Sequence, residues 1–268
     1  MNRRRFLGVG AAGSATAMMG GMAQAAQAPG AHGSAAREFY LLRRYQFASG
    51  PQLSMAEQYF GKALIPAINR MGMTQVGAMK LDVGTETPAY YLLVPGGSVE
   101  TLATLDLRLA DDAEFMKAGE PFWAAPAKQP AFVRLESSLL SAFPGWPKLT
   151  PPKAGTGAKR IFQMRTYESP SHAAHVRKME MFHRGEFEIF RKAGCEAVFY
   201  ADQLVGSRLP CLTYMLTFAN EAELNAGWEK FRTDPEWQKL SHSERYAYEA
   251  IVSNISNQFL SPLACSQI

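Results

Sequence analysis

The chain is poor in the residues that build most recognisable reaction centres. It has three cysteines in 268 residues, and no two of them have the C-x-x-C spacing of a metal or redox site. Downstream of residue 36 there is no glycine-rich phosphate loop, no G-x-S-x-G nucleophile turn and no apolar run long enough to cross a bilayer. We therefore expect no metal, no cofactor and no membrane span in the body of the chain.

Charge of one sign is also scarce. The formal net charge is +4, but three of the basic residues are Arg3, Arg4 and Arg5, and without them 25 basic residues face 24 acidic ones. No stripe of lysine and arginine remains that would follow a nucleic-acid backbone. The balance indicates a protein without a nucleic-acid partner.

The N-terminus has the pattern of an export signal. Asn2-Arg3-Arg4-Arg5-Phe6-Leu7 fits the twin-arginine pattern, small and apolar residues follow, and Ala23-Gln24-Ala25 is a small-x-small cleavage site. The sequence predicts a signal peptide over residues 1–25, a flexible leader over 26–36, and a periplasmic or exported protein. Retention of the segment as an uncleaved anchor is the alternative.

Two stretches of the chain resemble each other at a constant offset of 122 positions. The matches fall on strand polar residues, helix aromatics and turn glycines and prolines: Arg43 with Arg165, Tyr45 with Tyr167, Phe60 with Phe182, Gly72 with Gly194, Val76 with Val198, Gly84 with Gly206 and Pro88 with Pro210. We interpret them as an internal repeat of one module.

Each copy has the same predicted order of elements, β-α-β-β-α-β. In the second copy alternation and helical periodicity predict strands at 159–168, 195–200, 211–218 and 250–260, and helices at 172–193 and 221–231 with a shorter one after Asp234-Pro235. In the first copy the corresponding strands are 38–47, 74–81, 89–94 and 132–140, and the helices are 53–71 and 99–108. This order is typical of a ferredoxin-like module.

The predicted fold class is therefore α+β, with two tandem ferredoxin-like modules that imitate a dimeric α/β barrel. The modules span residues 37–142 and 159–268, and a proline-rich linker spans 143–158. On this arrangement Cys195 and Cys211 begin adjacent antiparallel strands and lie too far apart for a disulfide.

The second copy resembles the NIPSNAP family. Ile161-Phe162-Gln163-Met164-Arg165-Thr166-Tyr167-Glu168 is similar to the family's opening strand, and 187–194, 209–218 and 228–237 follow in the family's order, with a bacterial type of ending through Ile268. The resemblance implies a dimeric α/β barrel and no established reaction. Gln163, and Leu41 in the first copy, replace a glutamate of the family pattern.

Four strand residues are the first candidates for a ligand site. Arg43, Tyr45, Arg165 and Tyr167 alternate with apolar residues, and we expect them to point into the barrel. A buried guanidinium needs an acceptor. The four side chains then form either a clamp for an anion or a carbonyl group, or ion pairs that tie the strands together.

The helix at 172–193 supplies weaker catalytic candidates. Helical periodicity places His183 and Glu186 on its apolar side, with His172 and His175 near its start, and places Lys178 on the solvated face. Structural pairing of His183 with Glu186 and a general base are both open. His172 and His175 lie too far from His183 to share a metal ion.

Two functions remain open. The first is an exported NIPSNAP-type barrel that binds a small organic ligand or a partner protein, with homo-oligomerisation undecided. The second is a cofactor-independent oxygenase or isomerase that would use His183, Glu186 or Tyr167, an analogy with other barrels of this kind. Whether the protein is an enzyme is left open by the sequence.

Overall fold

The computed structural model describes residues 36–48, 50–155, 157 and 159–268. The predicted signal peptide, and the predicted leader up to residue 35, lie outside the described residues. Among the helices in the described part of the chain, none is both long and apolar enough to cross a membrane.

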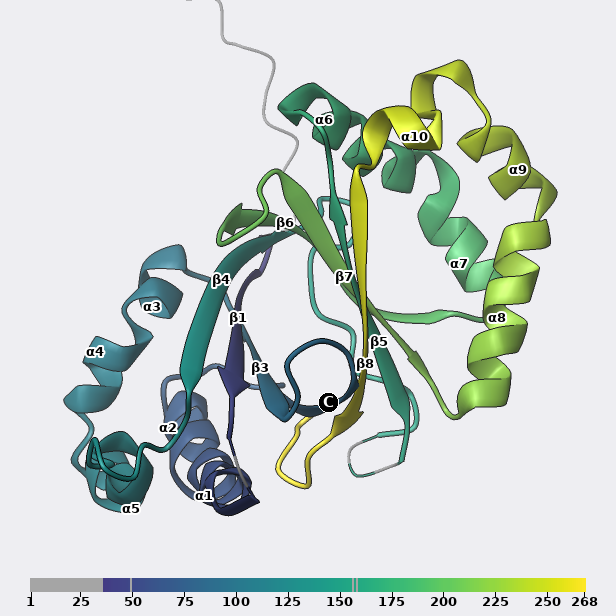
Figure 1. The fold of residues 1–268 in the computed structure, drawn as a ribbon. Coiled ribbons are helices and arrows are strands. Elements are labelled where there is room, and N and C mark those ends of the chain that lie inside the picture. Colours follow the sequence, from purple (N-terminus) through teal and green to yellow (C-terminus); the bar gives the residue numbers. More distant parts are fainter. Residues whose placement is uncertain (1–35, 49, 156, 158) are drawn as a thin grey trace, which may run out of the picture. The chain divides into compact units, whose positions relative to one another are not determined.

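Eight strands close into one antiparallel barrel (Figure 1). Their bounds are Phe39–Gln46 (β1), Gly77–Val83 (β2), Ala89–Gly96 (β3), Arg134–Ala142 (β4), Ile161–Glu168 (β5), Glu196–Val205 (β6), Cys211–Phe218 (β7) and Asn254–Pro262 (β8). The order around the barrel is β1-β3-β2-β8-β5-β7-β6-β4. The first four strands are therefore neighbours in the order β4-β1-β3-β2, and the last four repeat that order as β8-β5-β7-β6.

The helices cover the outside of the barrel, those of the first half over β1–β4 and those of the second half over β5–β8 (Figure 1). Their bounds are Gly50–Tyr59 (α1), Ile65–Arg70 (α2), Val99–Ala103 (α3), Leu105–Ala110 (α4), Ala113–Trp123 (α5), His172–Met181 (α6), Phe187–Ala193 (α7), Glu221–Thr233 (α8), Pro235–Ser241 (α9) and Tyr248–Ile251 (α10). A short 3-10 turn, Glu244–Tyr246 (η3), precedes α10. The shorter helix that the sequence predicts after Asp234 is α9, and Asp234 caps it: its side chain accepts from the backbone N–H groups of Glu236 and Trp237.

Both long helices that the sequence predicts are interrupted by a π-helical turn. Phe60–Leu64 (η1) lies between α1 and α2, and Phe182–Glu186 (η2) lies between α6 and α7. Within η2, Gly185 leaves the helical conformation at φ 157° and kinks the helix. A single regular helix over 172–193 is therefore wrong, and side-chain directions beyond residue 181 differ from those of a uniform helical wheel.

The barrel interior is apolar, and the expectation that the arginine and tyrosine pairs point into it is wrong. One buried cluster draws on every strand: Tyr40, Met79, Tyr91, Leu140, Phe162, Met164, Phe199, Met215 and Leu260 are among its members. Arg43, Tyr45, Arg165 and Tyr167 occupy the alternate positions of β1 and β5 and lie under the helices. Both faces of the sheet are covered, so the alternation alone does not say which face is inside.

The linker packs against the second half. Phe143 and Leu149 are buried, and the N–H groups of Phe143 and Thr150 donate to the carbonyl oxygens of Tyr200 and Val198, both of β6, at 2.9 and 2.8 Å. These hydrogen bonds hold the linker against β6.

Candidate functional site

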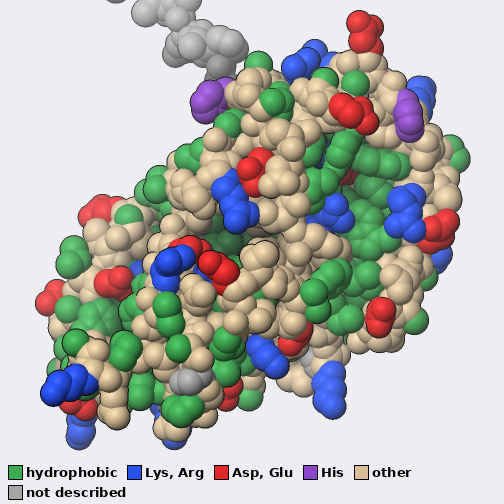
Figure 2. Space-filling model, viewed as in Figure 1, with side chains coloured by type: hydrophobic (Ala, Val, Ile, Leu, Met, Phe, Trp, Pro, Cys, Tyr) green, Lys and Arg blue, Asp and Glu red, His purple; other side chains and the backbone are tan. Residues whose placement is uncertain are grey.

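A large cavity lies between the outer face of β5 and the helices α8, α9 and α10. Its volume is about 1060 Å³, and Figure 2 shows hydrophobic side chains gathered around a hollow in this part of the surface. It is lined by Gln163, Arg165, Tyr167, Asn225, Ala226, Trp228, Glu229, Phe231, Arg232, Trp237, Ser241, His242, Tyr248 and Glu249. Two of the four predicted ligand residues, Arg165 and Tyr167, thus line one cavity.

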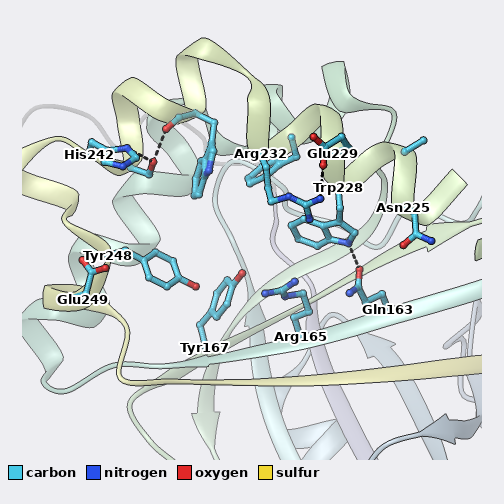
Figure 3. A pocket seen from close by; sticks show the side chains of 14 residues that line it. Gln163, Arg165, Tyr167, Asn225, Trp228, Glu229, Arg232, His242, Tyr248 and Glu249 are labelled. Atoms are coloured by element: carbon cyan, nitrogen blue, oxygen red, sulfur yellow. Dashed lines mark hydrogen bonds and ion pairs between the residues drawn. The ribbon is translucent and has the colours of Figure 1, made fainter. Parts of the chain in front are cut away.

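Arg165 presents an unpaired guanidinium to this cavity. Among the described residues no hydrogen-bond acceptor or ion-pair partner is found for it, and its Nε is buried without a partner. Its Cζ lies 4.5 Å from the centre of the Trp228 ring and 5.4 Å from that of Tyr167. Figure 3 shows the guanidinium between these two side chains. The rings hold the cation by cation–π attraction, and its N–H groups remain available to an acceptor.

Arg43, at the corresponding place in β1, is paired at both terminal nitrogens, while its Nε, like that of Arg165, is buried without a partner. Its Nη1 and Nη2 donate to Oδ1 and Oδ2 of Asp106 in α4, at 2.8 and 2.9 Å. Tyr45 packs among Phe47, Phe60 and other rings of the first half and lies in no described cavity. The two arginines are therefore not joined in one clamp: Arg43 is bound to Asp106, and Arg165 has no hydrogen-bond partner among the described residues.

Gln163 fixes the aromatic wall of the cavity. Trp228 Nε1 donates to Gln163 Oε1 at 2.6 Å, and Gln163 Nε2 donates to Asn257 Oδ1 at 3.0 Å. The side-chain amide accepts one hydrogen bond and donates another here, whereas a carboxylate can only accept. The replacement of the family glutamate by Gln163 thus has a local reason, although the sequence gives no sign of the Trp228 contact.

Tyr167 is a hydrogen-bonding group that stays protonated. Its hydroxyl lies 3.0 Å from that of Tyr214, a fully buried residue of β7. Burial raises the pKa of Tyr167 well above the ordinary value. In Figure 3 the hydroxyl of Tyr248 points toward Tyr167, and burial raises the pKa of Tyr248 as well. At neutral pH both are neutral donors.

Lys178 and Glu186 form a buried ion pair behind the cavity wall. Lys178 Nζ lies 2.7 Å from Glu186 Oε2, and the side chains are 0% and 1% exposed. The prediction that Lys178 lies on the solvated face is wrong, because Tyr167 of β5, Trp237 of α9 and Tyr248 of α10 surround its ammonium group. Glu186 has Lys178 as its partner, so the proposed pairing with His183 is wrong as well.

The histidines are held by local bonds. His183 Nδ1 donates to the carbonyl oxygen of Met179 at 2.8 Å, and its Nε2 accepts from the N–H of Gly145 at 3.1 Å. Both ring nitrogens are thus engaged outside the cavity. His175 Nε2 lies 2.7 Å from Asp202 Oδ1, and His172 is exposed.

Nothing else in the described residues forms a comparable centre. No group of three His, Cys, Asp or Glu side chains in the described ranges could hold a metal ion. Burial raises the pKa of both Cys195 and Cys211 to about 12, so neither supplies a thiolate near neutral pH. A second cavity of about 420 Å³ at one mouth of the barrel contains Arg44, which is paired with Glu86 and Glu136.

Comparison with known proteins agrees with the resemblance in the second half. No curated protein sequence matches this chain. Residues 162–267 match the model of the family described as NIPSNAP. This stretch is a NIPSNAP domain. It contains β5 from Phe162 onward, the buried pair and every residue that lines the large cavity.

The NIPSNAP domain belongs to a barrel with wider structural relatives. A provisionally assigned monooxygenase from Fusobacterium nucleatum has a TM-score of 0.53 at 8% identity, over 85% of this chain and 93% of that one. A second, from Lactobacillus acidophilus, has a TM-score of 0.53 at 11% identity, over 84% and 94%. A NIPSNAP-like domain protein from Burkholderia xenovorans aligns over 38% of this chain and 84% of that one, with a TM-score of 0.34 at 17% identity. The first two share the mixed α/β fold.

Proposed function

We propose that the NIPSNAP domain of this protein binds a small organic anion, a carboxylate with an aromatic or apolar body, in the cavity over β5. The observation that carries the proposal is the unpaired guanidinium of Arg165 in a cavity of about 1060 Å³. Ligand sites of this size are typically apolar with a few polar groups that fix orientation. Here Tyr167, Trp228 and Trp237 supply the rings, and Arg165 supplies the anchor.

The charge balance supports an anionic ligand. Arg165 and Lys178 carry two positive charges close to the cavity, against the single negative charge of Glu186. At the rim, Glu229 and Arg232 cancel each other through a contact of 2.6 Å. Glu249 is exposed and lies beyond Tyr248 in Figure 3, so solvent screens it. A carboxylate on Arg165 would balance the remaining positive charge.

Binding is favoured over catalysis as the function of this cavity. An oxygenase or isomerase needs a base that reaches the ligand. Of the three catalytic candidates that the sequence predicts, His183 is bonded away from the cavity, Glu186 is bonded to Lys178, and Tyr167 is a neutral donor. The monooxygenase names of the fold relatives say nothing of this chain at 8% and 11% identity.

The Arg165→Met variant tests the proposal. Purified protein is titrated with benzoate, 2-naphthoate and octanoate, and with the uncharged amide of each, and the fluorescence of Trp228 and Trp237 is followed. We expect at least one carboxylate to bind and its amide to bind more weakly. Arg165→Met should weaken carboxylate binding by at least about tenfold, because a charge-assisted hydrogen bond contributes about 1.5–3 kcal/mol.

Arg43→Met is the matched control, since it removes the same group from the equivalent strand position. It should leave binding intact and lower the melting temperature, because it breaks the bidentate contact to Asp106. Arg165→Met should keep its melting temperature. The opposite pattern, a large loss of stability with unaltered binding in Arg165→Met, would show that Arg165 is structural and would refute the site.

We also propose that the two halves are tandem copies of one ferredoxin-like module. The strands β1 and β5 and the turns η1 and η2 each begin 122 residues apart, and both halves have the same strand order. A partner protein or a second copy of the chain would bind at the exposed surface of the protein, outside this cavity.

Export through the twin-arginine route is proposed from residues 2–25. We expect the mature protein isolated from cells to begin at Ala26, after the Ala23-Gln24-Ala25 site, and we expect Arg3→Lys/Arg4→Lys to keep the full-length chain inside the cytoplasm. Intact-mass measurement of the periplasmic and cytoplasmic fractions checks both. A full-length mass in the wild-type membrane fraction would indicate an anchor instead.

A further inference from the structure

The buried Lys178–Glu186 pair is separated from the ligand cavity by a single layer of rings. Lys178 Nζ lies 4.6 Å from the centre of the Phe182 ring, 5.1 Å from Tyr167, and 5.9 Å from both Trp237 and Tyr248. Tyr167, Trp237 and Tyr248 also line the cavity. A buried ion pair costs desolvation free energy and is rarely kept for stability alone.

The first half of the barrel shows that the fold does not need this pair. The positions 122 residues earlier hold Ala56 in α1 and Leu64 in η1, and both are buried. The same π-helical turn forms there with Phe60, Ala63 and Leu64 as its buried residues and no buried charge. The ion pair therefore occurs in the half where the arginine is free for a ligand, and is missing from the half where Arg43 is bound to Asp106.

Arg165 is the charged group that acts electrostatically on both Lys178 and Glu186. Burial lowers the pKa of Lys178 and raises that of Glu186, their mutual attraction opposes both changes, and the positive charge of Arg165 lowers the pKa of each. The other titratable groups that face this region are the tyrosine hydroxyls of β5, β6, β7 and α10: Tyr167, Tyr200, Tyr214 and Tyr248. Burial raises the pKa of all four, so they stay neutral.

We infer that the Lys178–Glu186 pair makes ligand binding proton-coupled, so that the cavity takes up a carboxylate together with a proton held by the pair. This rests on the proposed anion site. A carboxylate on Arg165 offsets the positive charge that opposes protonation of the pair. By linkage, ligand binding then favours the protonated pair, and protonation of the pair favours the ligand.

Calorimetry in two buffers tests the inference. Binding of 2-naphthoate is measured near pH 6.5 in phosphate and in imidazole, whose heats of ionisation differ. The wild type should show different binding heats in the two buffers, equivalent to a net uptake of up to one proton. Its affinity should rise as the pH falls, by about tenfold in all, which corresponds to a change of about one pKa unit in one group.

Two variants assign the proton. Lys178→Met/Glu186→Leu removes the pair, imitates the apolar first half, and should bind with the same heat in both buffers. Glu186→Gln, which still offers Lys178 an acceptor, provides the same comparison if the double variant does not fold. His242→Asn controls for the exposed histidine at the cavity rim, and should keep the proton uptake of the wild type.

The outcomes separate the inference from the proposed function. Equal heats in both buffers for the wild type overturn the proton coupling and leave the anion site standing. Loss of the buffer difference in His242→Asn assigns the proton to that histidine and also overturns it. If none of the three carboxylates binds to the wild type, the anion site fails, and the inference fails with it.

Discussion

Glu186→Leu is expected to lower the free energy of unfolding by about 3–5 kcal/mol, because it leaves the ammonium group of Lys178 buried without its partner. Both side chains are inaccessible to solvent, at 0% and 1% exposure, and Nζ and Oε2 are 2.7 Å apart. The one other hydrogen-bond contact found for Lys178 Nζ in the described residues is Met181 Sδ at 3.5 Å, a weak acceptor. Urea denaturation at neutral pH measures the loss.

The control is the double variant Lys178→Met/Glu186→Leu. It removes both charges and keeps the side-chain volume, so it should recover most of the lost stability. Ala56 and Leu64 at the equivalent positions show that this turn can be apolar. A double variant as unstable as Glu186→Leu alone would mean that the pair contributes packing or hydrogen bonds that the fold requires, and that it is not an addition for the site.

Much of the barrel could be predicted from the sequence because strand alternation and turn residues are local signals. β7 has the predicted bounds, and β5 begins two residues later than predicted. The side of each strand that faces inward could not be predicted in the same way. The helix side of β5 is as buried as the interior side. It carries Gln163, which is hydrogen-bonded to Trp228 of α8, and Arg165 and Tyr167, which line the cavity.

Two residues of the candidate site could be predicted from strand alternation. Arg165 and Tyr167 stand out as polar residues on a strand, but the sequence treats Arg43 and Tyr45 as their equals. The difference lies in Asp106, a residue of α4 with no counterpart bonded to Arg165. The periodicity of the sequence does not indicate which distant residues form ion pairs.

Lys178 shows what helix periodicity misses here. It lies in the regular helix α6, before the π-helical turn, and shares the buried face of that helix with Ala174, His175 and Met181. Beyond residue 181 the π-helical turn changes the angle per residue and Gly185 kinks the chain. The kink lies between the two members of the pair, which are eight residues apart and still within 2.7 Å. We therefore connect the shape of this turn with the pair.

Gly185→Ala is expected to lower the free energy of unfolding by about 1–3 kcal/mol, because φ 157° is open to glycine and strained for any other residue. Space is not the cause: an added Cβ would lie 3.7 Å from Leu240 Cδ2 and 3.9 Å from Ile189 Cδ1, which is ordinary contact. Gly194→Ala, at φ 82° beyond the end of α7 and with nothing within 4 Å, is the matched control. It should cost about 1 kcal/mol.

The cost of Gly185→Ala should depend on the ion pair. In the first half the same position is Ala63, and η1 is built without a charged pair. If the kink serves to bring Glu186 to Lys178, the helix can straighten once the pair is removed, so Gly185→Ala should cost at least about 1 kcal/mol less in the Lys178→Met/Glu186→Leu background. A double-mutant cycle of urea denaturation curves measures this coupling. An equal cost in both backgrounds would mean that the kink is set by the packing of α9 and α7 against the turn, independently of the buried charges.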